Sequence, residues 1–311
     1  MLSLRGWLAA SCACLGLVVS STGCAGATDD TGSSTADLST SCGLDPASPE
    51  SPRRLMDQPM KDGADAQTRL RCLREELTIQ HDGRAPFAAL YSDITDSAHA
   101  AILAHRFEDN EWLERYMTTF AELYRVAFVG YIDGHADEIP GSWRIAFDAA
   151  KDERTLIAQH VSLGVNAHVD RDLSHALVIA GIGHDRETRE SRKRDHFKVN
   201  EILRENVDAA LQRLAETYAP GFGQAPDAVM NILSDTYFHA VVAGRFKAWL
   251  DAVALEDAPA LLRPAVEAQI EVSSKLIAQA ILVPSLSPEL TEKLHELEAG
   301  HQDRAGFVTA R

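Results

Sequence analysis

The sequence lacks the short motifs that mark several common catalytic sites. It contains no phosphate-binding GxxxxGK(S/T) loop, no GxGxxG dinucleotide pattern, no GxSxG nucleophile elbow and no HExxH zinc helix. It also contains no apolar run of about 20 residues, the length that a membrane-spanning helix needs. These absences set aside P-loop nucleotide hydrolases, dinucleotide-dependent enzymes, serine hydrolases of the α/β type and zincin peptidases.

Basic residues are scarce as well. The chain has 30 Lys and Arg against 46 Asp and Glu, which gives a formal net charge of −16. Because binding to phosphate groups depends on a surplus of Lys and Arg, nucleic acid and anionic lipid surfaces are not expected partners. The content of 45% hydrophobic and 24% charged residues is typical of a globular domain.

The amino-terminal residues have the composition of an export signal. Residues 1–23 carry one charge, Arg5, followed by an apolar run of about 13 residues from Trp7 to Val19. The next residues, Ser-Ser-Thr-Gly-Cys at 20–24, resemble the bacterial lipoprotein processing box, in which small residues precede an acylated cysteine. We therefore expect an exported protein that is anchored to a membrane of the cell envelope by lipid on Cys24. The alternative is plain secretion, because Ser21 stands where leucine is commoner.

Cysteine is rare in the mature chain. Cys12 and Cys14 leave with the signal, so only Cys42 and Cys72 remain beyond Cys24. Two cysteines in an oxidising compartment favour one disulfide, which would stabilise the fold by roughly 3–4 kcal/mol on the chain-entropy model. Two unpaired thiols are the alternative.

The rest of the chain divides into a tether and one domain. Residues 24–60 are rich in Ser, Thr, Gly, Asp and Pro, which favours a flexible tether. Residues 61–311 show apolar residues at helical spacing and no sustained alternation, so we expect a single all-α domain, an orthogonal bundle of about eight or nine helices. Helices are expected at about residues 65–80, 86–106, 109–134, 140–150, 152–182, 192–218, 226–254, 258–283 and 288–299.

A run of mixed charge extends from Arg186 to Asp195. One interpretation is a solvated loop that leads into a helix. The other is a cationic mouth for an anionic substrate.

The polar residues of one predicted helix form the leading candidate site. His168 and Asp172 are four residues apart, so on a helix they share a face on which an imidazole nitrogen and a carboxylate can converge on one cation. His160 falls near the same stripe. Asn166 and Asp170 form a second pair four residues apart on a neighbouring face, and their polar groups need partners if buried. Arg171 adjoins this pair as a further structural candidate. The alternative is that His168 and Asp172 pair only with each other.

Further candidate residues lie elsewhere in the chain. His135, His196 and His239 are possible additional metal ligands, and Asp195 precedes His196, with Asn200 one turn later. Either Asp172 or Asp195 could act as a general base without a metal.

Several of these strings resemble an uncharacterised bacterial family filed as domain of unknown function 5995. The resemblance covers about residues 60–255 and implies a domain assignment, not an activity. The strings that carry it are Pro86-Phe87-x-x-Leu90-Tyr91, Ile139-Pro140-Gly141-Ser142-Trp143-Arg144-Ile145-Ala146-Phe147-Asp148, Asn166-Ala167-His168-x-x-x-Asp172-Leu173, Asp195-His196-x-x-Val199-Asn200 and Phe246-x-x-Trp249.

A partial likeness concerns the helix containing Gly164, His168 and Asp172. It is similar to a helix of zinc-dependent phospholipase C and the related single-strand nuclease fold, and this likeness implies that His168 and Asp172 ligate zinc. The sequence departs from that pattern at Val178, where the superfamily has a histidine. Its mature amino terminus would also be an acylated cysteine, whereas the superfamily uses a free amine as a ligand.

Three functions are compatible with these observations. The first is a metal-dependent hydrolase of esters such as phosphoesters, in which zinc or manganese activates water. The second is a non-catalytic envelope module that binds a small molecule or a protein. The third is a metal-free enzyme with a carboxylate base.

Replacing Cys24 by alanine should move the protein from the membrane fraction to the soluble fraction, because the acyl chains are the only anchor that we identify. Immunoblotting of fractionated cells measures this shift. An unchanged membrane fraction would refute the lipoprotein assignment.

Overall fold

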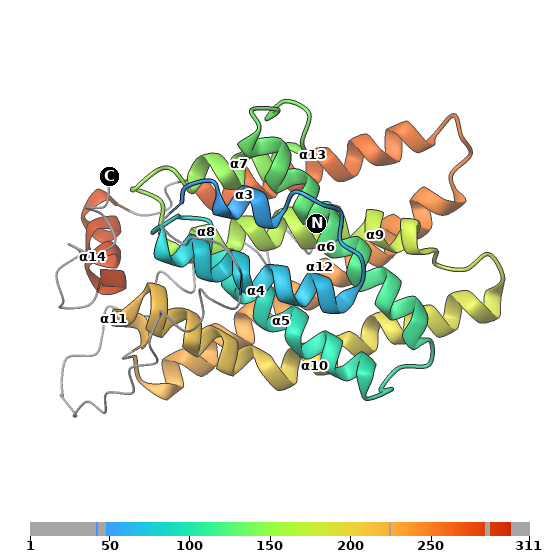
Figure 1. The fold of residues 1–311 in the computed structure, drawn as a ribbon, viewed down its shortest axis with the longest axis horizontal. Helices are drawn as coiled ribbons and strands as arrows, with labels where there is room; N and C mark the ends of the chain where they lie inside the picture. Colours follow the sequence, from blue (N-terminus) through green and yellow to red (C-terminus); the bar gives the residue numbers. More distant parts are fainter. Residues whose placement is uncertain (1–41, 43–47, 224, 284–286, 300–311) are drawn as a thin grey trace.

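The computed structural model describes residues 42, 48–223, 225–283 and 287–299, and within these ranges it contains helices and no strand (Figure 1). The predicted all-α fold is confirmed. Cys24 and the predicted signal lie outside the described residues. The elements are α3 (Ser51–Leu55), α4 (Gly63–Ile79), α5 (Ala85–Leu103), α6 (Asn110–Ile132), α7 (Gly141–Ala149), α8 (Ile157–Val165), η2 (Asn166–Asp172), α9 (Leu173–Ala180), α10 (Arg186–Tyr218), α11 (Pro220–Gly223), α12 (Asp227–Asp257), α13 (Arg263–Leu282) and α14 (Pro288–Ala299).

Aspartate side chains fix the start of three of the helices. Asp62, Asp109 and Asp185 each accept a hydrogen bond from a backbone N–H in the first turn of α4, α6 and α10. Asp185 explains one difference from the sequence prediction. The helix expected at 192–218 begins six residues earlier, because the mixed-charge run forms the first turns of α10 and not a loop.

Two other predicted helices also differ from the structure. The helix expected at 258–283 begins at Arg263, after a turn that contains Pro259. The long helix expected at 152–182 is composed of α8, η2 and α9, and it ends at Gly181, whose φ of 82° favours glycine.

Two adjoining clusters of buried apolar side chains form the core. Helices α4, α5 and α10 lie side by side across the face seen in Figure 1, and α6, α9 and α12 pack behind them. One cluster includes Tyr124 and Trp143, and the other includes Trp112 and Trp249. Four partly buried side chains pack against both clusters: Ile94 of α5, Phe120 of α6, Val169 of η2 and Val241 of α12. The two clusters therefore meet where these four elements converge.

The folded region begins before residue 60. The first two residues of α3, Ser51 and Pro52, are buried. Met56 is fully buried in the core, and its carbonyl accepts a hydrogen bond from Arg125 of α6. The buried residues Ser51, Pro52, Met56 and Met60 show that part of the segment predicted as a tether, residues 24–60, contacts the domain.

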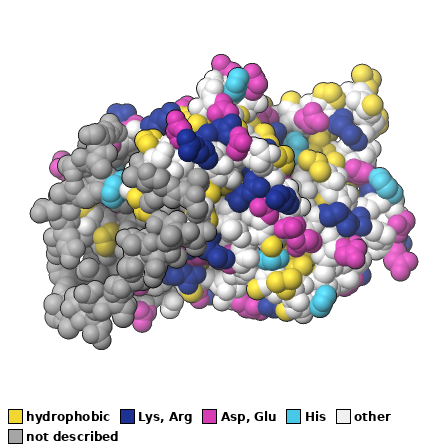
Figure 2. All heavy atoms as spheres, viewed as in Figure 1, with side chains coloured by type: hydrophobic (Ala, Val, Ile, Leu, Met, Phe, Trp, Pro, Cys, Tyr) yellow, Lys and Arg dark blue, Asp and Glu magenta, His cyan; other side chains and the backbone are white. Residues whose placement is uncertain are grey.

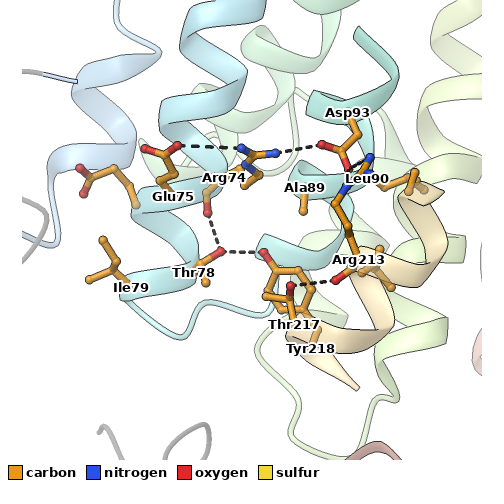
Figure 3. A pocket seen from close by; sticks show the side chains of 13 residues that line it. Arg74, Glu75, Thr78, Ile79, Ala89, Leu90, Asp93, Arg213, Thr217 and Tyr218 are labelled. Atoms are coloured by element: carbon orange, nitrogen blue, oxygen red, sulfur yellow. Dashed lines mark hydrogen bonds and ion pairs between the residues drawn. The ribbon is translucent and has the colours of Figure 1, made fainter. Parts of the chain in front are cut away.

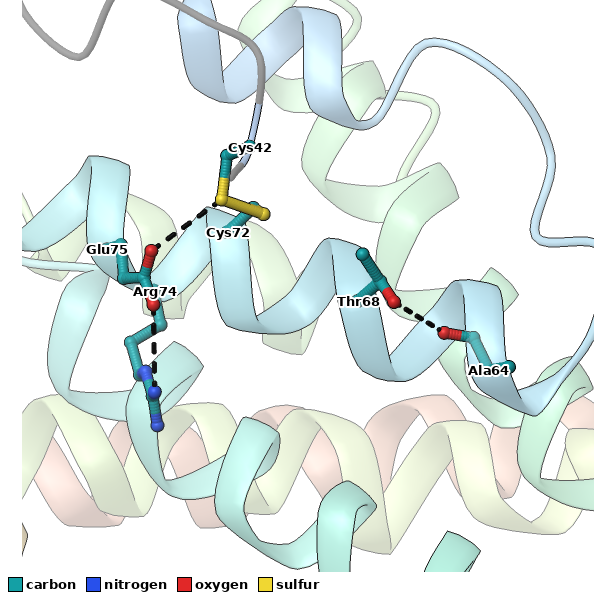
Figure 4. Close-up of a disulfide and its surroundings, with 6 residues drawn as sticks. All are labelled: Cys42, Ala64, Thr68, Cys72, Arg74 and Glu75. Atoms are coloured by element: carbon teal, nitrogen blue, oxygen red, sulfur yellow. Dashed lines mark hydrogen bonds and ion pairs between the residues drawn. A yellow bond between two sulfur atoms is a disulfide. The ribbon is translucent and has the colours of Figure 1, made fainter. Parts of the chain in front are cut away.

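A disulfide joins Cys42 to Cys72 of α4 (Figure 4). The Cys42 sulfur lies 3.6 Å from a carboxylate oxygen of Glu75 on the same helix. Burial raises the pKa of Glu75, although the charges of Arg74 and Arg71 oppose this shift. The disulfide fastens the chain before α3 to the outer face of α4.

Basic and acidic side chains are interspersed over the visible surface (Figure 2). None of the helices in the described part of the chain combines the length and the apolar character that crossing a membrane requires.

Helices α5 and α8 approach each other closely at Gly164. A carbon added at Gly164 would lie 2.3 Å from Cγ of Phe87. The Phe87 ring cannot easily yield, because it packs against the rings of Tyr91, Tyr124 and Trp143. Glycine is required at this position by packing.

Replacing Gly164 by alanine should lower the free energy of unfolding by about 1–3 kcal/mol, because overpacking outweighs a helix-propensity gain of about 1 kcal/mol. Urea unfolding followed by circular dichroism measures this change. The half-buried Ser162 of the same helix offers the control Ser162→Ala, which should stay within about 0.5 kcal/mol of wild type. Equal stability of Gly164→Ala and wild type would contradict the described packing.

Candidate functional site

The candidate site lies on a π-helical segment. η2 is π-helical, and at its end the backbone N–H of Leu173 reaches the carbonyl of His168, five residues back. The chain is therefore wider here than in the α-helices α8 and α9. This segment coincides with the polar string Asn166–Asp172 of the predicted site. Short π segments within α-helices often mark functional sites.

Asp172 is the centre of the buried hydrogen-bond network. Its carboxylate is fully buried, and it accepts hydrogen bonds from the indole Nε1 of Trp143 at 2.6 Å and from Arg171 at 2.8 Å. The His168 Nδ1 atom lies 3.5 Å from the same oxygen that Trp143 contacts. Burial alone would raise the pKa of Asp172, but the contacts with His168 and Arg171 lower it below its usual value, so Asp172 is ionised.

His168 links this network to the core. Its ring stacks on Phe120 with a centroid distance of 3.4 Å and lies 4.4 Å from the ring of Tyr91. Burial lowers the pKa of His168, so the imidazole is neutral at pH 7. With Nδ1 directed at Asp172, the buried Nε2 atom has no hydrogen-bond partner among the described residues.

His168 also lines a cavity of about 90 Å³ between α5, α6, η2, α10 and α12, which we call the inner cavity. A second cavity of about 70 Å³ adjoins it. Both cavities are lined by Tyr91, Ile94, Phe120, Leu203 and Arg245. The inner cavity therefore lies at the junction of the two core clusters.

The pair His196 and Asn200 lies beside these cavities on α10. His196 contacts the Tyr116 hydroxyl at 3.0 Å through Nδ1 and the Arg245 carbonyl at 3.0 Å through Nε2. Asn200 accepts a hydrogen bond from Nε of Arg245 at 2.7 Å. Burial lowers the pKa of His196 well below its usual value. His196 and Asn200 thus hold Arg245 in position.

Other predicted site residues lie apart from the inner cavity. Asp195 accepts hydrogen bonds from the backbone N–H groups of Glu108 and Asp109, so it supports the start of α6. His135 is exposed and lies 3.4 Å from Glu138. His239 is exposed on α12.

Asn166 and Arg171 have structural partners, whereas the Nδ1 atom of His160 has no hydrogen-bond partner among the described residues. Asn166 donates to the Ser274 carbonyl of α13 at 2.9 Å, and Arg171 also lies 3.8 Å from Glu271 of the same helix. His160 is buried in α8, where burial lowers its pKa to about 4.

The predicted metal ligands do not converge. Within the described ranges, no three His, Cys, Asp or Glu side chains are grouped so that they could hold a metal ion. Near His168, the one carboxylate in contact is Asp172, whose oxygens already accept from Trp143 and Arg171. The donor set present therefore does not fit a multi-ligand zinc or manganese site.

The sequence did not indicate Trp143, Phe120 or Arg245 as members of the site. The sequence pattern predicted only that Trp143 and Phe120 are aromatic residues of the core. Arg245 carried a detectable signal, because it is a charged residue within the apolar stretch 240–250 of a predicted helix.

A larger outer cavity, of about 330 Å³, lies between α4, α5 and α10 (Figure 3). Its polar groups are paired with one another. Arg74 and Arg213 both donate to Asp93, and the hydroxyls of Thr78 and Tyr218 lie 2.6 Å apart. These pairs occupy the groups that would otherwise recognise a ligand.

Three arginines of the mixed-charge run are also paired. Arg194 donates to Glu108, Arg192 lies 3.4 Å from Asp109, and Arg189 donates to Asp257. None of these arginines lines the inner cavity.

Replacing Trp143 by phenylalanine should cost about 1–2 kcal/mol more stability than replacing Trp112 by phenylalanine, measured by urea unfolding. Both indoles are fully buried and both donate through Nε1, but Trp143 donates to the Asp172 carboxylate and Trp112 to the Gly181 carbonyl. The two changes remove similar volume. The difference between their losses in free energy of unfolding therefore measures the cost of removing a hydrogen-bond donor from the buried charge of Asp172. Equal costs would argue against an ionised Asp172.

Comparisons with known proteins give the family of the chain. No curated protein and no solved structure matches it, so nothing further supports the likeness to zinc-dependent phospholipase C. A family model matches residues 64–284, which include every helix from α5 to α13 and nearly all of α4. The chain therefore belongs to the family of unknown function DUF5995.

Proposed function

We propose that this protein is a non-catalytic module of the cell envelope that binds a small, largely apolar molecule in the inner cavity. The observation that carries the proposal is the buried Nε2 of His168, which lacks a hydrogen-bond partner among the described residues on a side chain that lines an apolar cavity. A buried polar atom of this kind normally has a partner, and a ligand would supply it.

The size and lining of the cavity favour a small apolar ligand. The inner cavity and its neighbour measure about 90 and 70 Å³ and are lined mainly by aromatic and aliphatic side chains. A protein cavity of about 150 Å³ lined by such residues stays dry and binds benzene. The ligand would therefore have a body about the size of one six-membered ring.

The cavity approaches the surface at α12. Three of the half-buried residues that line it, Tyr237, Phe238 and Val241, lie on α12. The helices α5 and α6 and the segment η2 each contribute one: Ile94, Phe120 and Val169. A ligand would enter past the α12 side chains.

His168 would give the ligand its orientation. A neutral imidazole with Nδ1–H directed at Asp172 offers Nε2 as a hydrogen-bond acceptor. A hydroxyl or N–H group on the ligand would donate to this nitrogen. The fixed network of Trp143, Arg171 and Asp172 would keep the imidazole in that tautomer.

Two enzymatic alternatives have weaker support. A metal-dependent hydrolase needs further ligands beside His168 and Asp172, and the described residues do not bring such ligands together. A metal-free enzyme with Asp172 or Asp195 as the base needs a carboxylate that can reach a substrate. Both carboxylates are fully buried, and each accepts two hydrogen bonds from the protein.

The location forms part of the proposal. The signal-like residues 1–23 and the processing box before Cys24 support export and lipid anchoring. A lipid-anchored binding module would collect its ligand outside the cytoplasm.

Toluene is a suitable neutral probe of the inner cavity. At ten times its Kd it should stabilise the purified protein by about 1.4 kcal/mol and raise Tm by about 3–6 °C. The variant Val207→Phe fills the cavity from α10 and should abolish this shift. Differential scanning calorimetry measures both proteins.

A matched control is Val126→Phe, because Val126 is an exposed residue of α6 that lines neither cavity. It should respond to toluene like wild type. The absence of any toluene effect on wild type would overturn the proposal. One equivalent of zinc or manganese in the purified protein, lost in His168→Ala, would favour the hydrolase instead.

A further inference from the structure

Arg245 is a buried cation at the wall shared by the two cavities. It lies on α12, its side chain lines both cavities, and the residue is 6% exposed. Within the described residues, no other Lys or Arg lines either cavity.

The groups that contact this guanidinium are neutral. Nε donates to the Asn200 side chain and Nη2 to the His196 carbonyl, and the Tyr116 hydroxyl is a third neighbour. The fully buried carboxylate of Asp170 lies against the neighbouring residue Gly244, where a Cβ would be 3.6 Å from both of its oxygens. The charge of Asp170 is not among the influences on the Arg245 pKa, which are burial and the Tyr116 hydroxyl. A guanidinium carries more N–H donors than these acceptors use.

Arg125, the other described arginine that is buried to a similar degree, has a carboxylate partner that Arg245 lacks. Arg125 is 9% exposed, and it forms a bidentate ion pair with Glu122 in addition to its bond to the Met56 carbonyl. Arg245 has neutral hydrogen-bond partners but no carboxylate equivalent to Glu122 among its contacts. Because a buried charge is costly unless it is paired, an opposite charge beside Arg245 would be strongly favoured.

Burial acts on Arg245 in the direction expected for an uncompensated cation. It lowers the pKa of the guanidinium below its usual value, and the Tyr116 hydroxyl only partly opposes this effect. An arginine nevertheless keeps its proton in a protein, so the positive charge remains at the cavity wall.

We propose that the ligand of the inner cavity carries one carboxylate, which pairs with Arg245 while its apolar body packs on Phe120 and its neighbours. This inference rests on the proposed binding function and specifies the ligand class. A single guanidinium matches a single negative charge and a planar, bidentate carboxylate. A phosphate ester would bring more charge than this one cation can balance. The ligand is thus a small aromatic or alicyclic monocarboxylic acid whose body also carries the hydroxyl or N–H group that donates to Nε2 of His168.

Benzoate and benzamide test the charge, because they have nearly the same shape and differ in one unit of charge. Isothermal titration calorimetry at pH 7 should give wild-type protein an affinity for benzoate at least about tenfold higher than for benzamide, since charged hydrogen bonds are roughly twice as strong as neutral ones. In Arg245→Gln this ratio should fall to about one, while toluene should still bind. Arg245→Lys keeps the charge but not the bidentate geometry of the guanidinium. Its ratio of benzoate to benzamide affinity should lie between those of wild type and Arg245→Gln.

Arg263→Gln is the matched control, because it removes the same charge from an exposed site on α13. It should keep the wild-type ratio. If Arg245→Gln does not fold, the wild-type ratio and Arg245→Lys still decide the question. Toluene binding with no preference for benzoate over benzamide would overturn this inference and leave the proposed function standing. Failure of toluene, benzoate and benzamide to bind wild type would overturn both.

Discussion

A buried carboxylate must be neutralised or accept hydrogen bonds. In the centre of this domain, side chains from several elements pack so that they contact the carboxylate of Asp172. Trp143 brings α7 onto η2 to donate to one oxygen, and Arg171 donates to the other. The same contacts turn His168 toward Phe120 and the cavity. The position of the imidazole therefore depends on how the charge of Asp172 is paired. The same pairing fixes where Nε2 of His168 lies in the wall of the inner cavity.

The helices were largely predictable because their signals are local. Apolar periodicity, with aspartate at the cap position 109 and proline at the first helical position 288, located α6 and α14 closely. The start of α10 was misplaced because charged side chains hide the periodicity there, although the Asp185 cap was present in the sequence. The π segment was not predictable, since the same residues could form an α-helix and only tertiary packing selects the wider turn.

The site was predictable only in part, for a related reason. His168 and Asp172 were found because they lie four residues apart on one helix. Their partner Trp143 is 29 residues before Asp172, and Arg245 comes from a different helix, so these contacts depend on the tertiary fold. Predicted ligands such as His135 and His239 shared the residue type but not the location. Residue type alone therefore gave a list of candidate site residues. Their burial in the fold showed which of them lie at the inner cavity and which lie on the surface.

The disulfide limits how far the domain could move from a membrane. For a chain anchored at Cys24, about 18 residues lead to Cys42, and these can span at most about 60 Å even when fully extended. Without the bond to Cys72, the attachment point would move to α3 at Ser51, and the limit would rise to about 90 Å. In such an anchored chain, the redox state of one cystine would thus set the radius within which the domain can move.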